Sequence, residues 1–205
     1  MVANNINVNN VTALKQSHST GGEISWLRVP QEETLPDDIQ AIFRVQRDRY
    51  GFVHPFFVGY SLNPDRLRRW FNYYDALQHG NGELSHRERE IIAVVVSVTN
   101  DCETCAITHQ AQLRDVTGDP AFAAAVADNY INANLTQKER ALADFAVKLT
   151  KLSQELSPED LIPLRQVGLS DEAILEAGEI AAHFSFANRL SKAFGWKVKR
   201  EQYNL

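Results

Sequence analysis

The stretch LSHREREIIAVVVSVTNDCETCAITH, residues 84–109, decides the fold of this chain and carries most of its chemistry. Its middle part, residues 91–98, is apolar and β-branched, so composition alone is compatible with a buried strand. Ser85 and Glu88, however, have the spacing of a capping box, and good helix formers at 87–90 lead directly into the apolar run. A helix that is apolar nearly all round is a central one, so we expect a buried core helix here.

An internal repeat supports the helix. Residues 84–99 align without gaps to residues 135–150, at an offset of 51 positions. Both copies place Ser or Thr three residues before Glu, continue with Arg and enter an apolar run. In the second copy, Ala, Lys and Asp interrupt that run with the period of an amphipathic helix. We therefore predict that both copies are helices.

Most of the remaining chain has the same helical periodicity. Gly118, Gly168 and Gly195 lie where helices should end. No hairpin signal or sustained alternating pattern occurs beyond residue 30, apart from Asn81-Gly82, which separates two helices. The sequence thus predicts an all-α fold. The predicted helices span residues 32–50, 64–79, 85–98, 102–117, 120–131, 137–152, 158–166 and 171–191, and an apolar connector covers 52–57.

Composition restricts the class of protein. The chain has 205 residues, of which 44% are hydrophobic and 23% charged, as in an ordinary soluble globular protein. The formal net charge is -5 and no basic block occurs, which argues against a nucleic acid or an anionic membrane as partner. The longest apolar run, residues 91–96, is too short to span a bilayer. We expect no nucleic-acid or membrane partner.

The domain organisation is predicted to be simple. Residues 1–24 are polar and rich in Asn, and we expect a flexible arm there, followed by a single helical domain over 25–205. The arm lacks a charged start followed by an apolar stretch, so no signal peptide is predicted. The two cysteines lie close together rather than scattered as in a secreted disulfide scaffold. A cytoplasmic protein with a reactive dithiol is the resulting expectation.

The sequence Cys102-Glu103-Thr104-Cys105, followed by His109, is the centre of the candidate site. At about 100° per residue, Cys102, Cys105 and His109 fall within an arc of about 60° on one helix face. We expect Asn100 or Asp101 to cap this helix and Cys102 to lie in its first turn. The helix dipole there favours the thiolate, although neighbouring carboxylates oppose it. An imidazole one turn along can take the thiol proton and return it.

The repeat also separates scaffold from chemistry. Glu88 and Arg89 recur as Glu139 and Arg140, so we interpret them as a helix cap and a surface charge. Glu90, in contrast, is replaced by Ala141. The positions that correspond to the cysteines and His109 are likewise not conserved within the repeat, being Ser153, Leu156 and Asp160. Glu90 is therefore the fourth candidate, able to orient the imidazole or accept its proton.

Other interpretations of the dithiol remain open at this point. Cys102, Cys105, His109 and a carboxylate could bind zinc, yet structural zinc sites normally bring a second ligand pair from a distant segment, and His183 is the only distant candidate. Covalent haem needs His directly after the second cysteine, where Ala106 stands. A thioredoxin-like fold would need further strands and a cis-proline. We expect no metal and no cofactor.

The motif from Glu90 to His109 and the preceding Leu84-Ser-x-Arg-Glu-Arg-Glu resemble the alkylhydroperoxidase D-like (AhpD-like), carboxymuconolactone decarboxylase superfamily. Gly51-Phe52-Val53 and the region from Gly168 to Arg189 resemble its peroxidase-related branch. The resemblance covers roughly residues 30–196. It implies an all-helical homo-oligomer and a thiol peroxidase or disulfide reductase without metal or haem.

The resemblance also implies roles for the four residues. Cys105 would attack the peroxide, Cys102 would supply a proton and close the disulfide, and Glu90 with His109 would form a proton relay. An external dithiol or protein would then reduce the disulfide. Thr104 stands where founding members often have a second histidine. Superfamily members without the cysteines are decarboxylases, so a lyase is an alternative function, beside a non-catalytic zinc-binding or interaction module.

One further cluster stands late in the chain. His183, Phe184, Phe186 and Asn188 combine aromatic and polar side chains at helical spacing. They could line a pocket, but we favour the interpretation that they form helix core and a helix end.

Overall fold

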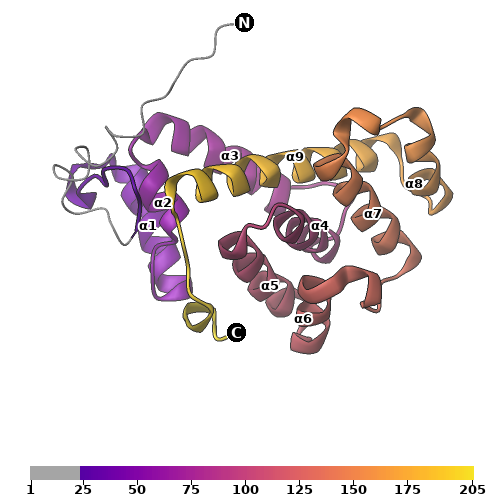
Figure 1. The fold of residues 1–205 in the computed structure, drawn as a ribbon. Coiled ribbons are helices and arrows are strands. Elements are labelled where there is room, and N and C mark those ends of the chain that lie inside the picture. Colours follow the sequence, from indigo (N-terminus) through magenta and orange to yellow (C-terminus); the bar gives the residue numbers. More distant parts are fainter. Residues whose placement is uncertain (1–23) are drawn as a thin grey trace, which may run out of the picture.

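The computed structural model describes residues 24–205, and within this range the chain is helical without any strand (Figure 1). The α-helices are α1 (Asp37–Tyr50), α2 (Pro55–Tyr60), α3 (Pro64–His79), α4 (His86–Thr99), α5 (Glu103–Thr117), α6 (Pro120–Asn129), α7 (Gln137–Lys151), α8 (Ile162–Gln166) and α9 (Asp171–Phe194). Short 3₁₀ turns are η3 (Glu32–Thr34), η4 (Tyr130–Asn132), η5 (Ser153–Glu155), η6 (Pro158–Leu161) and η7 (Arg200–Tyr203). The predicted all-α fold is confirmed, while the predicted arm lies, but for its last residue, outside the described residues.

The boundaries differ from the prediction where proline intervenes. The first helix begins at Asp37 instead of residue 32, because Pro36 at its N-cap separates it from η3. The predicted connector 52–57 contains the start of α2, whose first residue is Pro55. The predicted helix 158–166 is split into η6 and α8. At the end of α9, Gly195 adopts φ 70°, a left-handed conformation that favours glycine.

Helix α4 is the centre of the main core, and it packs against α5, α7 and α9 (Figure 1). Ile91, Ile92 and Val94 are completely buried, and the apolar run continues through Val96. Each such side chain contributes about 1.5–3 kcal/mol of hydrophobic stabilisation. The β-branched segment is thus a helix, as the capping box predicted, because burial on all sides replaces the sheet that its composition would suit.

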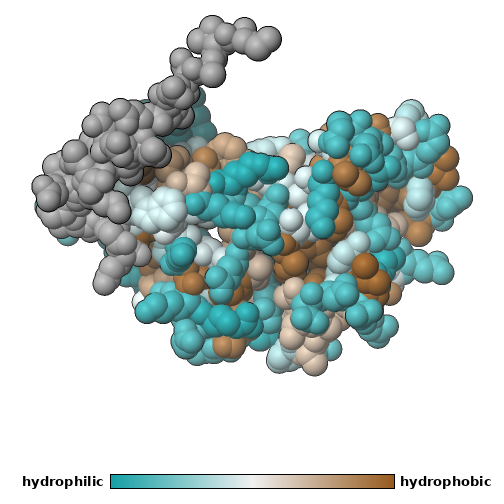
Figure 2. Space-filling model, in the orientation of Figure 1, coloured by the Kyte–Doolittle hydropathy of each residue, from teal (hydrophilic) through white to brown (hydrophobic). Residues whose placement is uncertain are grey.

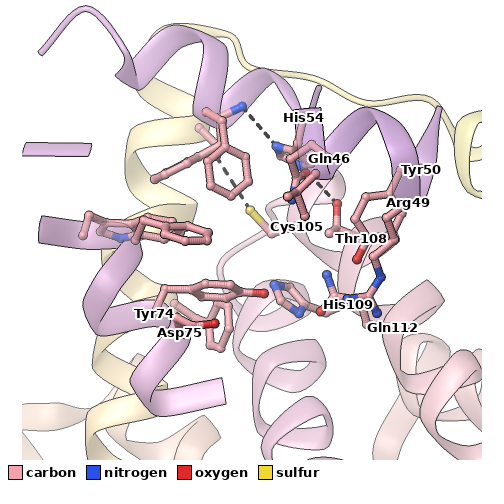
Figure 3. Close-up of a pocket in the computed structure, with 18 of the residues that line it drawn as sticks. Gln46, Arg49, Tyr50, His54, Tyr74, Asp75, Cys105, Thr108, His109 and Gln112 are labelled. Carbon is pink, nitrogen blue, oxygen red and sulfur yellow. Dashed lines mark hydrogen bonds between the residues drawn. The ribbon is translucent and has the colours of Figure 1, made fainter. Parts of the chain in front are cut away.

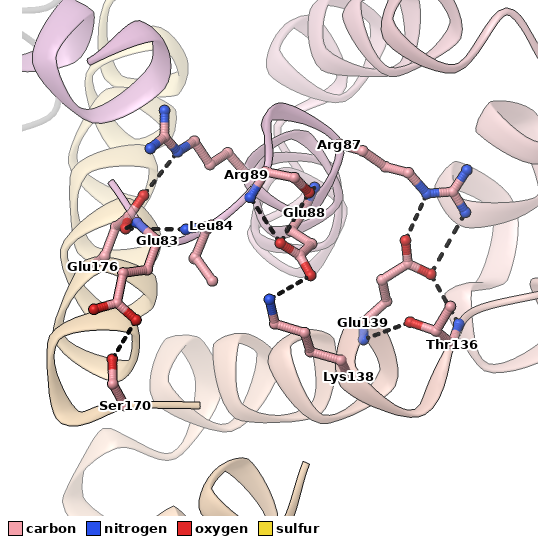
Figure 4. Close-up of polar contacts among 11 residues, drawn as sticks. Glu83, Leu84, Arg87, Glu88, Arg89, Thr136, Lys138, Glu139, Ser170 and Glu176 are labelled. Atoms are coloured by element: carbon pink, nitrogen blue, oxygen red, sulfur yellow. Dashed lines mark hydrogen bonds and ion pairs between the residues drawn. The ribbon is translucent and has the colours of Figure 1, made fainter. Parts of the chain in front are cut away.

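The two copies of the repeat, α4 and α7, form a reciprocal arrangement (Figure 4). Each begins with a capping box, on Ser85 and Glu88 in α4 and on the corresponding residues in α7. The Glu of each box also binds the cation of the other copy. Arg87 Nε lies 2.5 Å from Glu139 Oε1, and Lys138 Nζ lies 2.9 Å from Glu88 Oε1. Because Arg87 corresponds to Lys138 and Glu88 to Glu139, the two ion pairs between α4 and α7 are equivalent under the repeat.

The interpretation of Arg89 as a surface charge is wrong. The side chain is buried, and its Nε donates to Glu176 Oε1 on α9 at 2.7 Å. Its Nη1 donates to the carbonyl oxygens of Gln78 and Gly80 at the end of α3. Arg89 therefore ties α4 to both α3 and α9, which a pattern of local charges does not reveal.

A second, smaller core lies between α1, α2 and α3. Leu35, Ile39, Phe43, Phe57 and Leu67 form it. The face seen in Figure 2 is largely hydrophilic, with hydrophobic patches between the charged side chains. Within the described part of the chain, no helix combines the length and the apolar character that crossing a membrane requires.

Candidate active site

The dithiol is placed by a tight turn between α4 and α5. Asp101 adopts a left-handed conformation with φ 51°, and the amide of Cys102 donates back to the Ser97 carbonyl at 2.9 Å. Cys102 is itself the N-cap of α5, so the expectation that Asn100 or Asp101 caps this helix is wrong. Asn100 instead ends α4, and its side-chain amide donates to Asn188 Oδ1 on α9.

Both sulfur atoms are buried, but they differ in what they face. Cys102 Sγ and Cys105 Sγ lie 2.6 Å apart as free thiols. Cys105 lines a cavity, whereas Cys102 does not (Figure 3). On α9, Ser191 Oγ lies 3.8 Å from Cys105 Sγ. A molecule in the cavity therefore meets Cys105 first, with Cys102 directly behind it.

The two thiols differ in pKa. The hydrogen bond with Cys105 lowers the pKa of Cys102, against the opposing effect of burial, and the charge of Lys192 adds to the lowering. The same hydrogen bond and burial raise the pKa of Cys105 well above its usual value. Hydrogen bonds from Asn188 and Ser191 act in the opposite direction on Cys105. Of the two thiols, Cys102 therefore loses its proton more readily.

Glu90 and His109 form a buried pair. The Nδ1 atom of His109 donates to Glu90 Oε2 at 2.9 Å, and Glu90 is completely buried. Burial raises the pKa of Glu90, but the charge of His109 and its hydrogen bond, with a smaller contribution from His86, outweigh this effect and lower it. The carboxylate therefore fixes the imidazole with its Nε2 atom free to act elsewhere.

A cavity of about 220 Å³ joins these groups (Figure 3). Cys105 and His109 both line it, and α1, α2, α3, α5, α9 and the C-terminal segment supply its walls. Aromatic side chains form a large part of the lining, for example Phe57, Trp70 and Phe184. Among the described residues, no direct hydrogen bond joins His109 to either thiol, so they meet across the cavity rather than in contact.

Tyr74 is a further polar group in this cavity. Its hydroxyl points toward His109 (Figure 3). Burial raises the pKa of Tyr74, so the hydroxyl stays protonated and available as a donor. Because this residue belongs to α3, its position depends on packing between helices and no local pattern predicts it.

His54 is a site residue that the sequence analysis missed. Its Nδ1 accepts from the Phe56 amide at 3.0 Å, and its Nε2 donates to Thr108 Oγ1 at 3.1 Å. Burial, with the charge of His109, lowers the pKa of His54 to about 3, so the ring is neutral. A His followed by Pro at the start of a helix is the signal that could have revealed it, since Pro favours the first helical position.

The cluster late in α9 is divided by the structure. Phe184 lines the cavity, with its ring centroid 4.4 Å from that of His109. His183 lies outside the lining and stacks on Trp70 at 4.9 Å. Asn188 is completely buried and donates to Ser97 Oγ, while Phe186 is 44% exposed. The favoured interpretation as helix core is right for His183, Asn188 and Phe184, which belongs to the main core as well as lining the cavity, and wrong for the exposed Phe186.

Zinc ligation requires at least three converging ligands. In the range 24–205, no group of three or more His, Cys, Asp or Glu side chains is arranged to hold a metal ion. His109 directs its Nδ1 at Glu90, and the two sulfurs face one another.

Comparison with known proteins places the chain. Residues 64–148 match the model of the carboxymuconolactone decarboxylase family. The fold is similar to that of an alkylhydroperoxidase AhpD-core, peroxidase-related protein from Ralstonia eutropha, with 37% identity, 88% of this chain and 95% of that chain covered, and a TM-score of 0.82. A peroxidase-related protein from a Silicibacter species gives 32% identity, 89% and 95% coverage, and a TM-score of 0.83.

More distant proteins share the architecture alone. The debrominase Bmp8 is 18% identical, with 88% of this chain and 96% of that chain covered and a TM-score of 0.74. Among curated proteins, no match was found. The two closer likenesses extend over nearly the whole length of both partners, and the family model covers the first copy of the repeat, most of the second and the dithiol. The chain therefore belongs to the AhpD-like, carboxymuconolactone decarboxylase superfamily.

Proposed function

We propose that this protein is a cysteine-based peroxidase that reduces a hydroperoxide with the dithiol of Cys102 and Cys105. The observation that carries the proposal is the placement of one sulfur in the cavity wall and the other 2.6 Å behind it. The names of the two closer relatives, both peroxidase-related proteins, support a role of this kind. Nucleophilic attack needs a thiolate that substrate can reach, and only Cys105 meets the second condition.

The first chemical step begins within the sulfur pair. Once Cys102 has lost its proton, a proton moves from Cys105 to the Cys102 thiolate, and hydrogen bonds from Asn188 and Ser191 favour the resulting Cys105 thiolate. This thiolate attacks the outer oxygen of the hydroperoxide, so that an S–O bond forms and the O–O bond breaks. The products are a sulfenic acid on Cys105 and an alkoxide, which takes a proton from His109. Glu90 stabilises the charged imidazole in this role.

The second step closes the disulfide. The Cys102 sulfur attacks the sulfenic sulfur, the S–O bond breaks, and the hydroxide leaves with the Cys102 proton as water. Overall, two thiols and one hydroperoxide give one disulfide, one alcohol and one water. An external dithiol or a protein thiol then reduces the disulfide by exchange. We also expect a homo-oligomer without metal or cofactor, as the resemblance implies.

The decisive experiment is mass spectrometry after one equivalent of a hydroperoxide. Because the chain contains only two cysteines, loss of two hydrogens from the peptide with Cys102 and Cys105 reports the proposed cycle directly. Cys105→Ser is expected to abolish dithiol-dependent peroxide consumption. Cys102→Ser is expected to stop at the sulfenic acid, which a dimedone adduct detects.

Each alternative gives a different result. Stoichiometric zinc that the purified protein retains under reducing conditions would favour the metal-binding module. An activity that is indifferent to alkylation of both cysteines would favour a lyase. An unchanged rate in Cys105→Ser would refute the assignment of that residue.

A further inference from the structure

Glu90 lies between two histidines. Its Oε2 accepts from His109 on α5, and its Oε1 faces His86 Nε2, which lies four residues earlier on α4, at 3.6 Å. Both Glu90 Oε1 and His86 Nε2 are buried and have no hydrogen-bond partner among the described residues. Buried polar atoms are nearly always satisfied, so two that face one another across so short a gap indicate an interaction made directly or through one water.

The other side of the His86 ring is open. The side chain is 38% exposed, and of its two ring nitrogens only Nε2 is among the buried polar atoms without a hydrogen-bond partner in the described residues. His86 does not line the cavity. His79 is in contact with both His86 and the cavity. It lines the cavity, and its ring packs perpendicular to that of His86 with 5.2 Å between the centroids. The His86 imidazole therefore has one nitrogen toward Glu90 and one toward solvent, outside the cavity.

We propose that His86 connects Glu90 to solvent and so completes a proton path from solvent through His86 and Glu90 to His109. The proposal rests on the proposed peroxidase function. The proton of Cys105 passes to Cys102, so the path is used after the O–O bond breaks, when it returns one proton to His109, which has given its own to the alkoxide. His86 acts through Glu90 and is therefore a positioning residue rather than a catalytic one.

The cavity explains why a separate path is needed. Its volume is about 220 Å³ and aromatic side chains form a large part of its walls, so a substrate that fills it leaves little room for water around His109. An imidazole that accepts a proton at one nitrogen and releases one at the other can bypass the filled cavity. The internal repeat supports a functional origin, because His86 and Glu90 change together, to Gln137 and Ala141, whereas the capping residues recur.

The test is His86→Gln. Gln is compatible with this position, since Gln137 occupies the same first turn of α7. Its amide can still donate to Glu90 Oε1, but it cannot pass a proton on. At saturating hydroperoxide, the rate of disulfide formation is expected to fall roughly tenfold or more, but by no more than the roughly 10²–10⁴ that direct proton transfer contributes. KM should stay unchanged, the solvent isotope effect on kcat should rise, and added imidazole should restore the rate.

Gln137→Ala is the matched control, because it alters the equivalent exposed position of the other copy and should leave the rate unchanged. A wild-type protein that forms a disulfide, beside a His86→Gln variant with unchanged kcat and isotope effect, would overturn the proton path alone. A slow variant that imidazole does not rescue would also contradict it, since this indicates a structural defect. A wild-type protein that forms no disulfide with peroxide would overturn the proposed function and the path with it.

Discussion

At the scale of single residues, the chemistry depends on which titratable groups burial holds neutral and which it holds charged. Glu90 stays ionised in a fully buried position because His109 pairs with it. His54 stays neutral because burial, together with the charge of His109, lowers its pKa, and both ring nitrogens are used in neutral hydrogen bonds. His54 and His109 line the same cavity, yet they differ in their interactions, because among the described residues His109 pairs with a carboxylate and His54 does not.

The neutral His54 makes stability depend on pH. Its pKa of about 3 in the folded protein lies below the usual 6.5, so the unfolded chain binds more protons between these values. The free energy of unfolding should therefore fall as the pH drops below about 6.5, by up to about 1.4 kcal/mol per pH unit from this residue. His54→Asn, which keeps a cap for α2, should flatten this dependence.

Urea unfolding at pH 7 and pH 5 measures this effect. His183, whose pKa burial lowers to about 4, contributes the same trend in both proteins and so serves as an internal reference. An equal loss of stability between the two pH values in His54→Asn and wild type would contradict the prediction.

At the scale of elements, the repeat builds its own interface. Each capping glutamate makes two interactions: it caps its own helix and it forms an ion pair with the cation of the other copy. The carboxylate of Glu139 is 5% exposed and Arg87 also covers the ring of Phe122, 4.0 Å from its centroid. The contact between α4 and α7 is therefore specified by polar groups as well as by the apolar core.

Loss of one cation should affect this interface measurably. Arg87→Gln is expected to lower the free energy of unfolding by about 1–2 kcal/mol, because it leaves a nearly buried carboxylate without its partner and removes a cation–π contact. Lys151→Gln, at an exposed position near the end of α7, is the control and should change stability by less than about 0.5 kcal/mol. Equal midpoints of chemical unfolding for both variants would show that the ion pair between Arg87 and Glu139 contributes nothing to stability.

At the scale of the whole molecule, the cavity is a joint product of the two cores. Helices α1 to α3 supply one wall, α5 and α9 supply the reactive wall, and Tyr203 brings in the C-terminal segment. The Tyr203 ring packs edge-on against Tyr50 and Phe52. Access to Cys105 is consequently set by residues from α1 to α3, α5, α9 and the C-terminal segment.

A larger side chain in the cavity wall should hinder access to Cys105 without changing the groups that react. Ala187 on α9 lines it and is 6% exposed, so Ala187→Leu narrows the approach to Cys105 without touching the thiols or Glu90. We expect alkylation of Cys105 by a bulky maleimide to slow at least about fivefold, with overpacking that costs about 1–3 kcal/mol of stability. Ala182→Leu, an exposed position on the same helix, should change neither quantity. Equal alkylation rates would mean that reagents reach the sulfur by another way.

The sequence by itself determined the all-α class, the helical nature of residues 91–98 and both capping boxes, and it proposed the candidate set Glu90, Cys102, Cys105 and His109. These are consequences of spacing along one helix or of a repeat, and such local patterns are written in the order of residues. It did not reveal His54, Tyr74, the burial of Arg89 or the exact turn that makes Cys102 an N-cap. Those features depend on contacts between helices that are far apart in the chain. A local sequence pattern does not specify which of many possible partners a side chain will contact.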